Sequence, residues 1–356
     1  MSVETPLVRP AADSADDTAV LRRESRWANQ RLGLLVAIGV LVTVFGLVKP
    51  VFFNEQLVLF PLLTDVAIFT VVALAQMVAL SIGHMNLAVG RMAAFAAMFT
   101  GMSYDLWGFP LWAGLLVGLA AGAGVGALTG LTIAKLRVNS FVVTLAMDFT
   151  LLGMIPLVYA NYTDAAAFTT KPPGMTELRQ YSLADICLGN VCGSPAVPQM
   201  LVLTVVAMAL VGWIYGRTRL GRELLMTGAN VRAAELSGIP TARRIVTVHL
   251  MSGALAALAG FMLAVDTGSF KASIGADFLL PSFLGAILGG TLLAGGVVSV
   301  LGTALGTTLV LVIRRGLDLL GIGLENLNIY LGLILLLAVS SDRVRSLIVL
   351  RTRRDR

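Results

Sequence analysis

Long stretches without a charged side chain are the feature that most limits how this chain can fold. Several of them run for about 17 residues or more, which is long enough for a helix to cross about 30 Å of hydrocarbon. They are continuously apolar and do not alternate, so helices are expected and a β-barrel is not. Only 13% of the residues are charged, against roughly a quarter in soluble domains. The sequence therefore predicts an all-α polytopic membrane protein.

Ten apolar segments are candidate transmembrane helices. They cover about residues 32–48, 59–80, 86–103, 111–133, 140–160, 198–216, 245–264, 279–293, 297–313 and 326–341. The expected organisation is an N-terminal arm (1–31), a transmembrane domain (32–341) and a basic tail (342–356). With the arm in the cytoplasm, ten crossings place both termini there. No apolar core followed by a small-residue cleavage site is seen in the arm, so no cleaved signal peptide is expected.

The distribution of basic residues supports this topology. Of 26 Lys and Arg residues, 19 fall on the predicted cytoplasmic side and six outside, with Arg91 unassigned. This bias follows the positive-inside rule. The net charge of +6 therefore reflects the orientation of the loops in lipid and is no reason to expect a nucleic-acid partner.

The segment 217–244 is an Arg-rich cytoplasmic interruption between two predicted spans. Asn230 is a signal for a helix start, and Gly238 followed by Pro240 is a signal for a helix end. One or two short helices with a face of small side chains are expected. Such an element suits the docking of a partner, and the alternative is an ordinary loop that contains a helix.

The external segment 161–197 contains both cysteines of the chain, Cys187 and Cys192. On the oxidising side of a membrane, two nearby cysteines favour a disulfide that closes a small loop. The alternative is two free thiols.

Glycine is repeated in two regions that occupy similar places in the two halves of the chain. Small residues four apart let helices approach closely in lipid, so both regions predict tight packing. Because the two spans run in opposite directions, an inverted internal repeat is also predicted. The first region contains Gly114, Gly118, Gly122, Gly126 and Gly130, with Gly124 expected on the same crowded face, and the second contains Gly289, Gly290, Gly295, Gly296, Gly302 and Gly306.

Ionisable and polar residues at membrane depth are functional candidates. No paired carboxylates, metal-ligand spacing or P-loop occurs among them, so no enzyme site, metal site or ATP site is expected on this chain. The two histidines are expected to be satisfied single histidines and not metal ligands, because no Cys or His partner is spaced for a metal. A transporter of this kind uses either an ion gradient, with Asp148 as the candidate carrier, or an ATPase on another chain. The candidates are Asp65, His84, Asn86, Arg91, Asp148, His249, Asp266, Arg314, Arg315 and Asp318.

The 217–244 segment carries a distinctive pattern, T-R-x-G-R followed by G-x-N-x-x-A-A-x-x-S-G-I. It resembles the cytoplasmic coupling loop of ribose/xylose-type ABC importer permeases, the branch related to branched-chain amino-acid permeases. Further similarity lies in Phe141–Ala146, Met251–Gly260 and Leu288–Gly306, so the resemblance covers about residues 32–341. The pattern is carried by Thr218, Arg219, Gly221, Arg222, Gly228, Asn230, Ala233, Ala234, Ser237, Gly238 and Ile239.

The resemblance implies a permease subunit of a binding-protein-dependent importer in the bacterial inner membrane. Its implied partners are a second permease subunit, identical or a sister chain, two ABC ATPase subunits that bind ATP and Mg²⁺, a periplasmic binding protein and membrane lipid. The solute would be a monosaccharide, or a nucleoside, polyol, sugar acid or amino acid. Ala234→Arg is expected to block ATPase coupling without unfolding the chain. The implied coupling residues are Gly228, Asn230, Ala233, Ala234, Glu235, Ser237 and Gly238.

The chain departs from the family pattern at positions that could border the solute path. The family's G-G-I-D-L-S-V-G-S is here Gly83–Arg91, with Asn86 in place of Asp, and the family's N-N-G-L-N-L begins here with Arg314 and Arg315. The candidate path residues are Asn86, Asp148, Arg314 and Arg315. The two arginines would suit an anionic solute, or they snorkel to the outer surface or pair with Asp318 and the binding protein.

Overall fold

The computed structural model describes most of the chain. It covers residues 13–163, 166–182, 187–188, 191–192 and 194–321, with the short pieces 329–330, 332–333 and 336 beyond them. Of residues 13–29, 187–188 and 191–192 it describes the backbone alone. Most of the predicted span 326–341, all of the tail 342–356 and the start of the arm lie outside the described residues.

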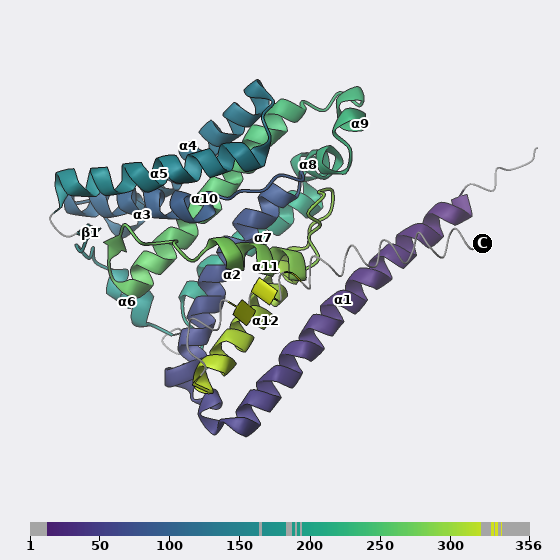
Figure 1. Ribbon diagram of the computed structural model, residues 1–356. Coiled ribbons are helices and arrows are strands. Elements are labelled where there is room, and N and C mark those ends of the chain that lie inside the picture. The colour runs from purple at the N-terminus through teal and green to yellow at the C-terminus, as the bar shows by residue number, and fades with distance from the viewer. Residues whose placement is uncertain are drawn as a thin grey trace, which may run out of the picture.

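Helices form nearly all of the described chain (Figure 1). The long helices are α1 (Asp13–Val48), α2 (Phe60–Leu80), α3 (Val89–Asp105), α4 (Leu111–Leu136), α5 (Ser140–Tyr162), α7 (Met200–Arg217), α10 (Thr241–Thr267) and α12 (Val300–Leu319). The shorter elements are a 3₁₀ turn (Pro50–Phe53), a π turn (Glu55–Leu59), α6 (Met175–Gln180), α8 (Arg219–Ala229), α9 (Val231–Leu236), α11 (Leu279–Leu288), and the strands β1 (Ala167–Phe168), β2 (Cys187–Leu188), β3 (Val191–Cys192) and β4 (Phe270–Lys271).

Within the described residues, seven helices are long and apolar enough to cross a membrane, where the sequence predicts ten spans. They are Gln30–Val48, Glu55–Leu80, Leu111–Leu136, Ser140–Tyr162, Met200–Arg217, Thr241–Thr267 and Val300–Leu319. The span predicted at 86–103 is the 17-residue helix α3, and the one predicted at 279–293 is the 10-residue helix α11. Both are short because backbone breaks, which hydropathy does not report, take up part of the crossing.

The first of these breaks is an elbow at residues 81–88 between α2 and α3, where Gly83 has a φ of +74°. A second lies between β4 and α11, and a third covers residues 289–299 between α11 and α12. Irregular backbone at membrane depth is tolerated where it is enclosed by protein. Ile82, Asn86 and Ala88 of the elbow are buried accordingly.

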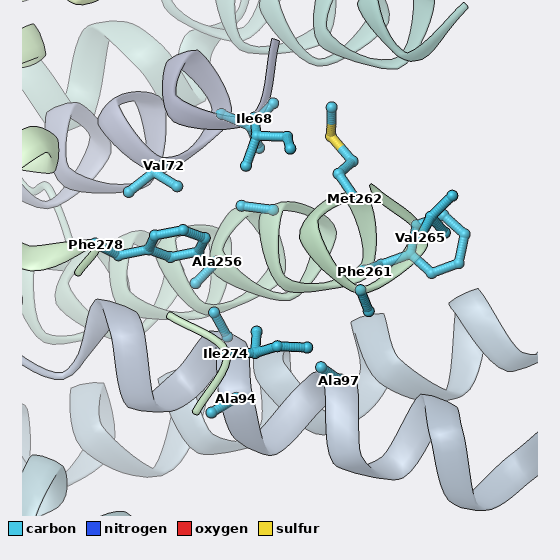
Figure 2. Close-up of a cluster of buried hydrophobic side chains, with 14 of the residues drawn as sticks. Ile68, Val72, Ala94, Ala97, Ala256, Phe261, Met262, Val265, Ile274 and Phe278 are labelled. Carbon is cyan, nitrogen blue, oxygen red and sulfur yellow. The ribbon is translucent and has the colours of Figure 1, made fainter. Parts of the chain in front are cut away.

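Helices α2 and α10 form the centre of the bundle. In the most apolar stretch of each span, 61% of the residues of α2 and 67% of those of α10 are buried, against 11% for α1. Figure 2 shows Ile68 and Val72 of α2 facing a row of α10 side chains that includes Ala256 and Met262. Helix α1 begins at Asp13, well before the predicted start near residue 32, and lies along one side of the bundle (Figure 1).

Helices α4 and α10 pack along a seam of glycines. A side-chain carbon added at Gly126 would come within 2.1 Å of the His249 carbonyl, and one at Gly122 within 2.6 Å of the Gly253 carbonyl. The four-residue repeat in α4 is therefore used for close backbone contact, as predicted. The expectation for Gly124 is wrong, because an added carbon there meets nothing within 4 Å.

The two cysteines lie on adjacent strands of the segment that joins α6 to α7. Strands β2 and β3 pair in antiparallel fashion with Cys187 directly opposite Cys192. Opposed residues of such a pair have Cα atoms about 4.5–5.5 Å apart, which lies within the range of about 4.4–6.8 Å that a disulfide spans. The disulfide therefore stays a prediction that the backbone register favours.

We predict that Gly126→Val destabilises the protein, because the added carbons must push α10 away from α4, at a cost of about 1–3 kcal/mol. Gly124→Val is the matched control on the same helix and should leave stability nearly unchanged. Thermal unfolding of the two variants in detergent measures the difference. Equal melting temperatures would contradict the seam.

We further predict that a membrane-impermeant maleimide labels neither Cys187 nor Cys192 until a reductant is added. Cys187→Ser should leave Cys192 reactive without reductant, since its partner is gone. Mass spectrometry of the labelled protein reads the result. Labelling of both thiols in the untreated protein would disprove the disulfide.

Candidate functional site

The segment 217–244 forms two short helices, as its start and end signals predict. Thr218 caps α8, its hydroxyl oxygen accepting from the Gly221 N–H at 3.1 Å. Asn230 separates the two helices and caps α9, its side-chain oxygen accepting from the Ala233 N–H at 3.0 Å. Gly238, with a φ of +76°, ends this part of the chain before α10 begins. Figure 1 shows α8 and α9 at the opposite end of the bundle from β1 and α6.

A cluster of charges fastens α8 to the start of α10. The Glu223 carboxylate accepts from Arg219 Nε at 2.8 Å and from Arg244 Nε at 2.6 Å. Burial acts to raise the pKa of Glu223, but the hydrogen bonds and positive charges of the two arginines outweigh it and hold that pKa below its ordinary value. The carboxylate therefore stays ionised near neutral pH and keeps the two helices joined.

Helix α9 presents apolar side chains to the outside of the chain. Leu236 is 90% exposed, and Val231 is also exposed. Ala234, by contrast, is only 3% exposed and lies on the inner side of the helix. This burial argues against the expectation that Ala234→Arg leaves the chain folded, since an arginine there would displace the side chains that cover Ala234.

Helix α8 makes direct backbone contact with the two irregular segments at this end of the bundle. A side-chain carbon at Gly228 would meet the Ser81 carbonyl at 2.0 Å and the Gly296 nitrogen at 2.5 Å. The Gly296 N–H donates to the Ser81 carbonyl at 2.9 Å. Gly83 and Gly295 are also in backbone contact, so we call Gly83, Gly228, Gly295 and Gly296 the glycine junction.

Asn86 lies in the elbow, a few residues beyond the junction, and is fully buried. Its side-chain nitrogen donates to the Ser252 hydroxyl of α10 at 2.9 Å, and its oxygen accepts from the Ala88 N–H at 3.1 Å. The side-chain nitrogen of Gln76, with its amide turned toward the elbow, donates to the backbone carbonyl oxygen of Asn86 at 2.9 Å. Asn86 thus holds the elbow against α2 and α10, and its polar atoms are already occupied.

The elbow also brings the two histidines together, although they are 165 residues apart in sequence. His84 Nδ1 and His249 Nε2 lie 3.3 Å apart, within hydrogen-bonding distance. The sequence does not predict this contact, because it considers each histidine singly. No group of three or more His, Cys, Asp or Glu side chains that could hold a metal is found in the described part of the chain.

Asp148 of α5 faces Arg91, which lies in the first turn of α3. Asp148 Oδ1 and Arg91 Nε are 3.8 Å apart, and the two side chains are 26% and 25% exposed. Asp148 lies about 12 Å along α5 from its start at Ser140, so this ion pair sits well inside the span. Asp148 is therefore not a free acid.

Arg314 and Arg315 lie near the C-terminal end of α12, which the predicted topology places outside, on the wall of a cavity of about 300 Å³ that we call the outer cavity. The Arg315 guanidinium donates to the Leu57 carbonyl at 2.8 Å and lies 3.4 Å from the Asp318 carboxylate. Pairing of these arginines with Asp318 was one of the two readings of the sequence. Asp65 and Asp277 also line the cavity.

The structure thus separates the candidate residues into the 217–244 segment, an elbow, an ion pair within the spans and the outer cavity. Asp277 is absent from the sequence-based candidates, and so is the contact of Gly228, a predicted coupling residue, with the other glycines of the junction. Asp277 lies in a short polar stretch that resembles an ordinary external loop. The junction joins three segments that are distant in the sequence, and glycine spacing within one segment cannot reveal such contacts.

Comparisons with known proteins agree with this architecture. The family model described as branched-chain amino acid transport system / permease component matches residues 58–339. The fructose import permease protein FrcC of Rhizobium meliloti is 27% identical over 342 residues, covering 93% of each chain. The ribose import permease protein RbsC of Escherichia coli K12 is 29% identical over 313 residues, covering 86% of this chain and 92% of its own.

The autoinducer 2 import system permease protein LsrD of Salmonella typhimurium LT2 is 28% identical over 284 residues, covering 79% of this chain and 81% of its own. No solved structure shows a significant match. Because the family model spans most of the chain and the seven apolar helices fit a multi-pass membrane protein, this chain belongs to the family of branched-chain amino acid transport system permease components.

Proposed function

We propose that this chain is the transmembrane subunit of an ATP-driven importer that takes up a monosaccharide delivered by a periplasmic binding protein. The observation that carries the proposal is the continuous contact from the exposed helix α9, through α8, to the elbow in the membrane. Three relatives that match this chain along most of their length are named as import permeases for fructose, ribose and autoinducer 2. Their names support a small sugar-like solute for this chain.

The coupling step follows from the glycine junction. An ATPase subunit in the cytoplasm would bind the exposed apolar tip of α9, with Leu236 as its centre. Gly228 touches Ser81 and Gly296 through backbone atoms, so no flexible side chain lies between them to absorb a movement. A movement of α8 therefore displaces the elbow and the 289–299 segment. Tightly packed elements shift between discrete arrangements, so such a push can open and close a path. The inner membrane and cytoplasmic termini are part of this proposal.

A second permease subunit would cover the face of the bundle that carries Arg91 and Asp148. Charged side chains inside a span are costly when they face lipid and normally face protein or a water-filled cavity. This pair is partly exposed within α3 and α5, so a neighbouring subunit and a polar path between the two copies would satisfy it. The proposal includes ATP and Mg²⁺ bound by the ATPase partners.

We predict that Leu236→Asp weakens binding of the ATPase subunits by at least about 2 kcal/mol, because an apolar anchor becomes charged. Leu236→Met is the conservative control and should behave as the unmodified chain. Co-purification with the ATPase subunits and ATP hydrolysis stimulated by the loaded binding protein are the two readouts. Normal stimulated hydrolysis in Leu236→Asp would refute docking through α9.

We also predict that Asp148→Asn and Arg91→Gln each lower uptake severalfold, since each leaves one uncompensated charge at membrane depth. The double variant should recover most of the uptake, and uptake should need the ATPase subunits throughout. Reconstituted vesicles with and without ATP measure both properties. An ion-coupled carrier would instead show uptake without ATPase subunits, and the double variant would stay inactive.

A further inference from the structure

The outer cavity exists because the chain between β4 and α11 descends into the membrane. Phe270 lies beside Gly101 of α3, where an added side-chain carbon would come within 2.7 Å of it. Gly275 lies beside Gly90, again in backbone contact. Along α3, Gly101 and Gly90 are separated by about 16 Å of helix. The segment 270–278 therefore runs inward by about that distance, and α11 begins at depth.

The bottom of the cavity is apolar and aromatic. Phe69, Phe278 and Leu311 are buried there, and the rings of Phe69 and Phe278 meet edge to face with centroids 5.6 Å apart. In Figure 2, Phe278 lies at the edge of the buried cluster, on the side of Val72. Such a floor offers a flat apolar surface to a ligand that has a C–H face.

Polar groups of both charges surround this floor. The cavity is lined by three carboxylates and two guanidinium groups, together with the Ser273 hydroxyl. Arg315 is already engaged by the Leu57 carbonyl and by Asp318. An anionic solute would meet more negative than positive groups here. A neutral solute with several hydroxyl groups could donate to the carboxylates and accept from Arg314. The charged residues are Asp65, Asp277, Asp318, Arg314 and Arg315.

We propose that this cavity is a binding site for a neutral polyhydroxylated solute, which it receives on the outer side before the elbow moves. The inference deepens the proposed importer function and rests on it. The volume of the outer cavity, about 300 Å³, lies at the lower end of the range for small-molecule sites, which suits a single sugar ring. The anionic solute that the two arginines suggested in the sequence is disfavoured, because the fold adds Asp65 and Asp277 to the same cavity.

The first test needs neither ATP nor uptake. Ser273→Cys places a thiol at an exposed position that lines the cavity. The rate at which a membrane-impermeant maleimide labels this thiol is measured in the purified chain, with the unmodified chain as the background. D-Ribose or D-fructose at high concentration should slow this labelling at least about threefold, while D-galacturonate should not. Equal rates with and without both neutral sugars, or stronger protection by the uronate, would overturn the proposal.

The second test uses the complete importer in vesicles with its ATPase subunits and binding protein. Asp277→Asn should lower uptake of the neutral sugar about tenfold, as expected for a lost hydrogen bond to a charged group, while stimulated ATP hydrolysis persists. Glu177→Gln, an acidic residue of α6 that does not line the cavity, is the matched control. If the unmodified importer takes up no sugar, the proposed function fails. If it does and Asp277→Asn transports normally, the cavity site alone fails.

Discussion

Close contact between backbones at glycine is the constraint on which the rest of this structure depends. In lipid, helices gain little from burying apolar surface against one another, so their association relies on close packing. The α4–α10 seam and the glycine junction both use this contact, with carbonyl groups where a side chain would otherwise be. The seam stabilises the bundle, whereas the junction joins α8, which the proposed topology places in the cytoplasm, to irregular backbone between the spans. One physical device therefore serves both stability and the transmission of movement.

The interruptions of the spans give this bundle its polar places. The elbow holds His84 and Asn86 against α10, which carries His249, and the inward course of residues 270–278 creates the outer cavity. Each break exposes backbone groups that lipid cannot satisfy, so each is enclosed by neighbouring helices. Polar groups therefore gather where a break in the chain meets a neighbouring helix: Ser273 and Asp277 of the irregular segment share the cavity with Asp65 of α2 and with the charged residues of α12. The Arg91–Asp148 pair lies on helical faces alone.

The segment 217–244 shows what local sequence signals can and cannot predict. Asn230 and Gly238 correctly indicate the start of one short helix and the end of the segment, because capping depends on neighbours a few residues away. The burial of Ala234 and the exposure of Leu236 were not predictable, because both depend on how α9 packs against the rest of the chain. The sequence located the helix, but the direction of its docking face came from tertiary contacts.

Uninterrupted apolar length determined the membrane class, most of the long helices and the closely packed glycines of α4, since each of these follows from the local chain in contact with lipid. Three things were decided by the tertiary structure alone: the shortness of α11, the pairing of His84 with His249, and the carboxylates that face Arg314. The last two join segments far apart in sequence, and the early end of α11 is a backbone break; hydropathy and spacing report neither. The charge of a cavity is likewise a sum over several helices, so two arginines read in isolation indicate an anion, whereas the folded cavity favours a neutral solute.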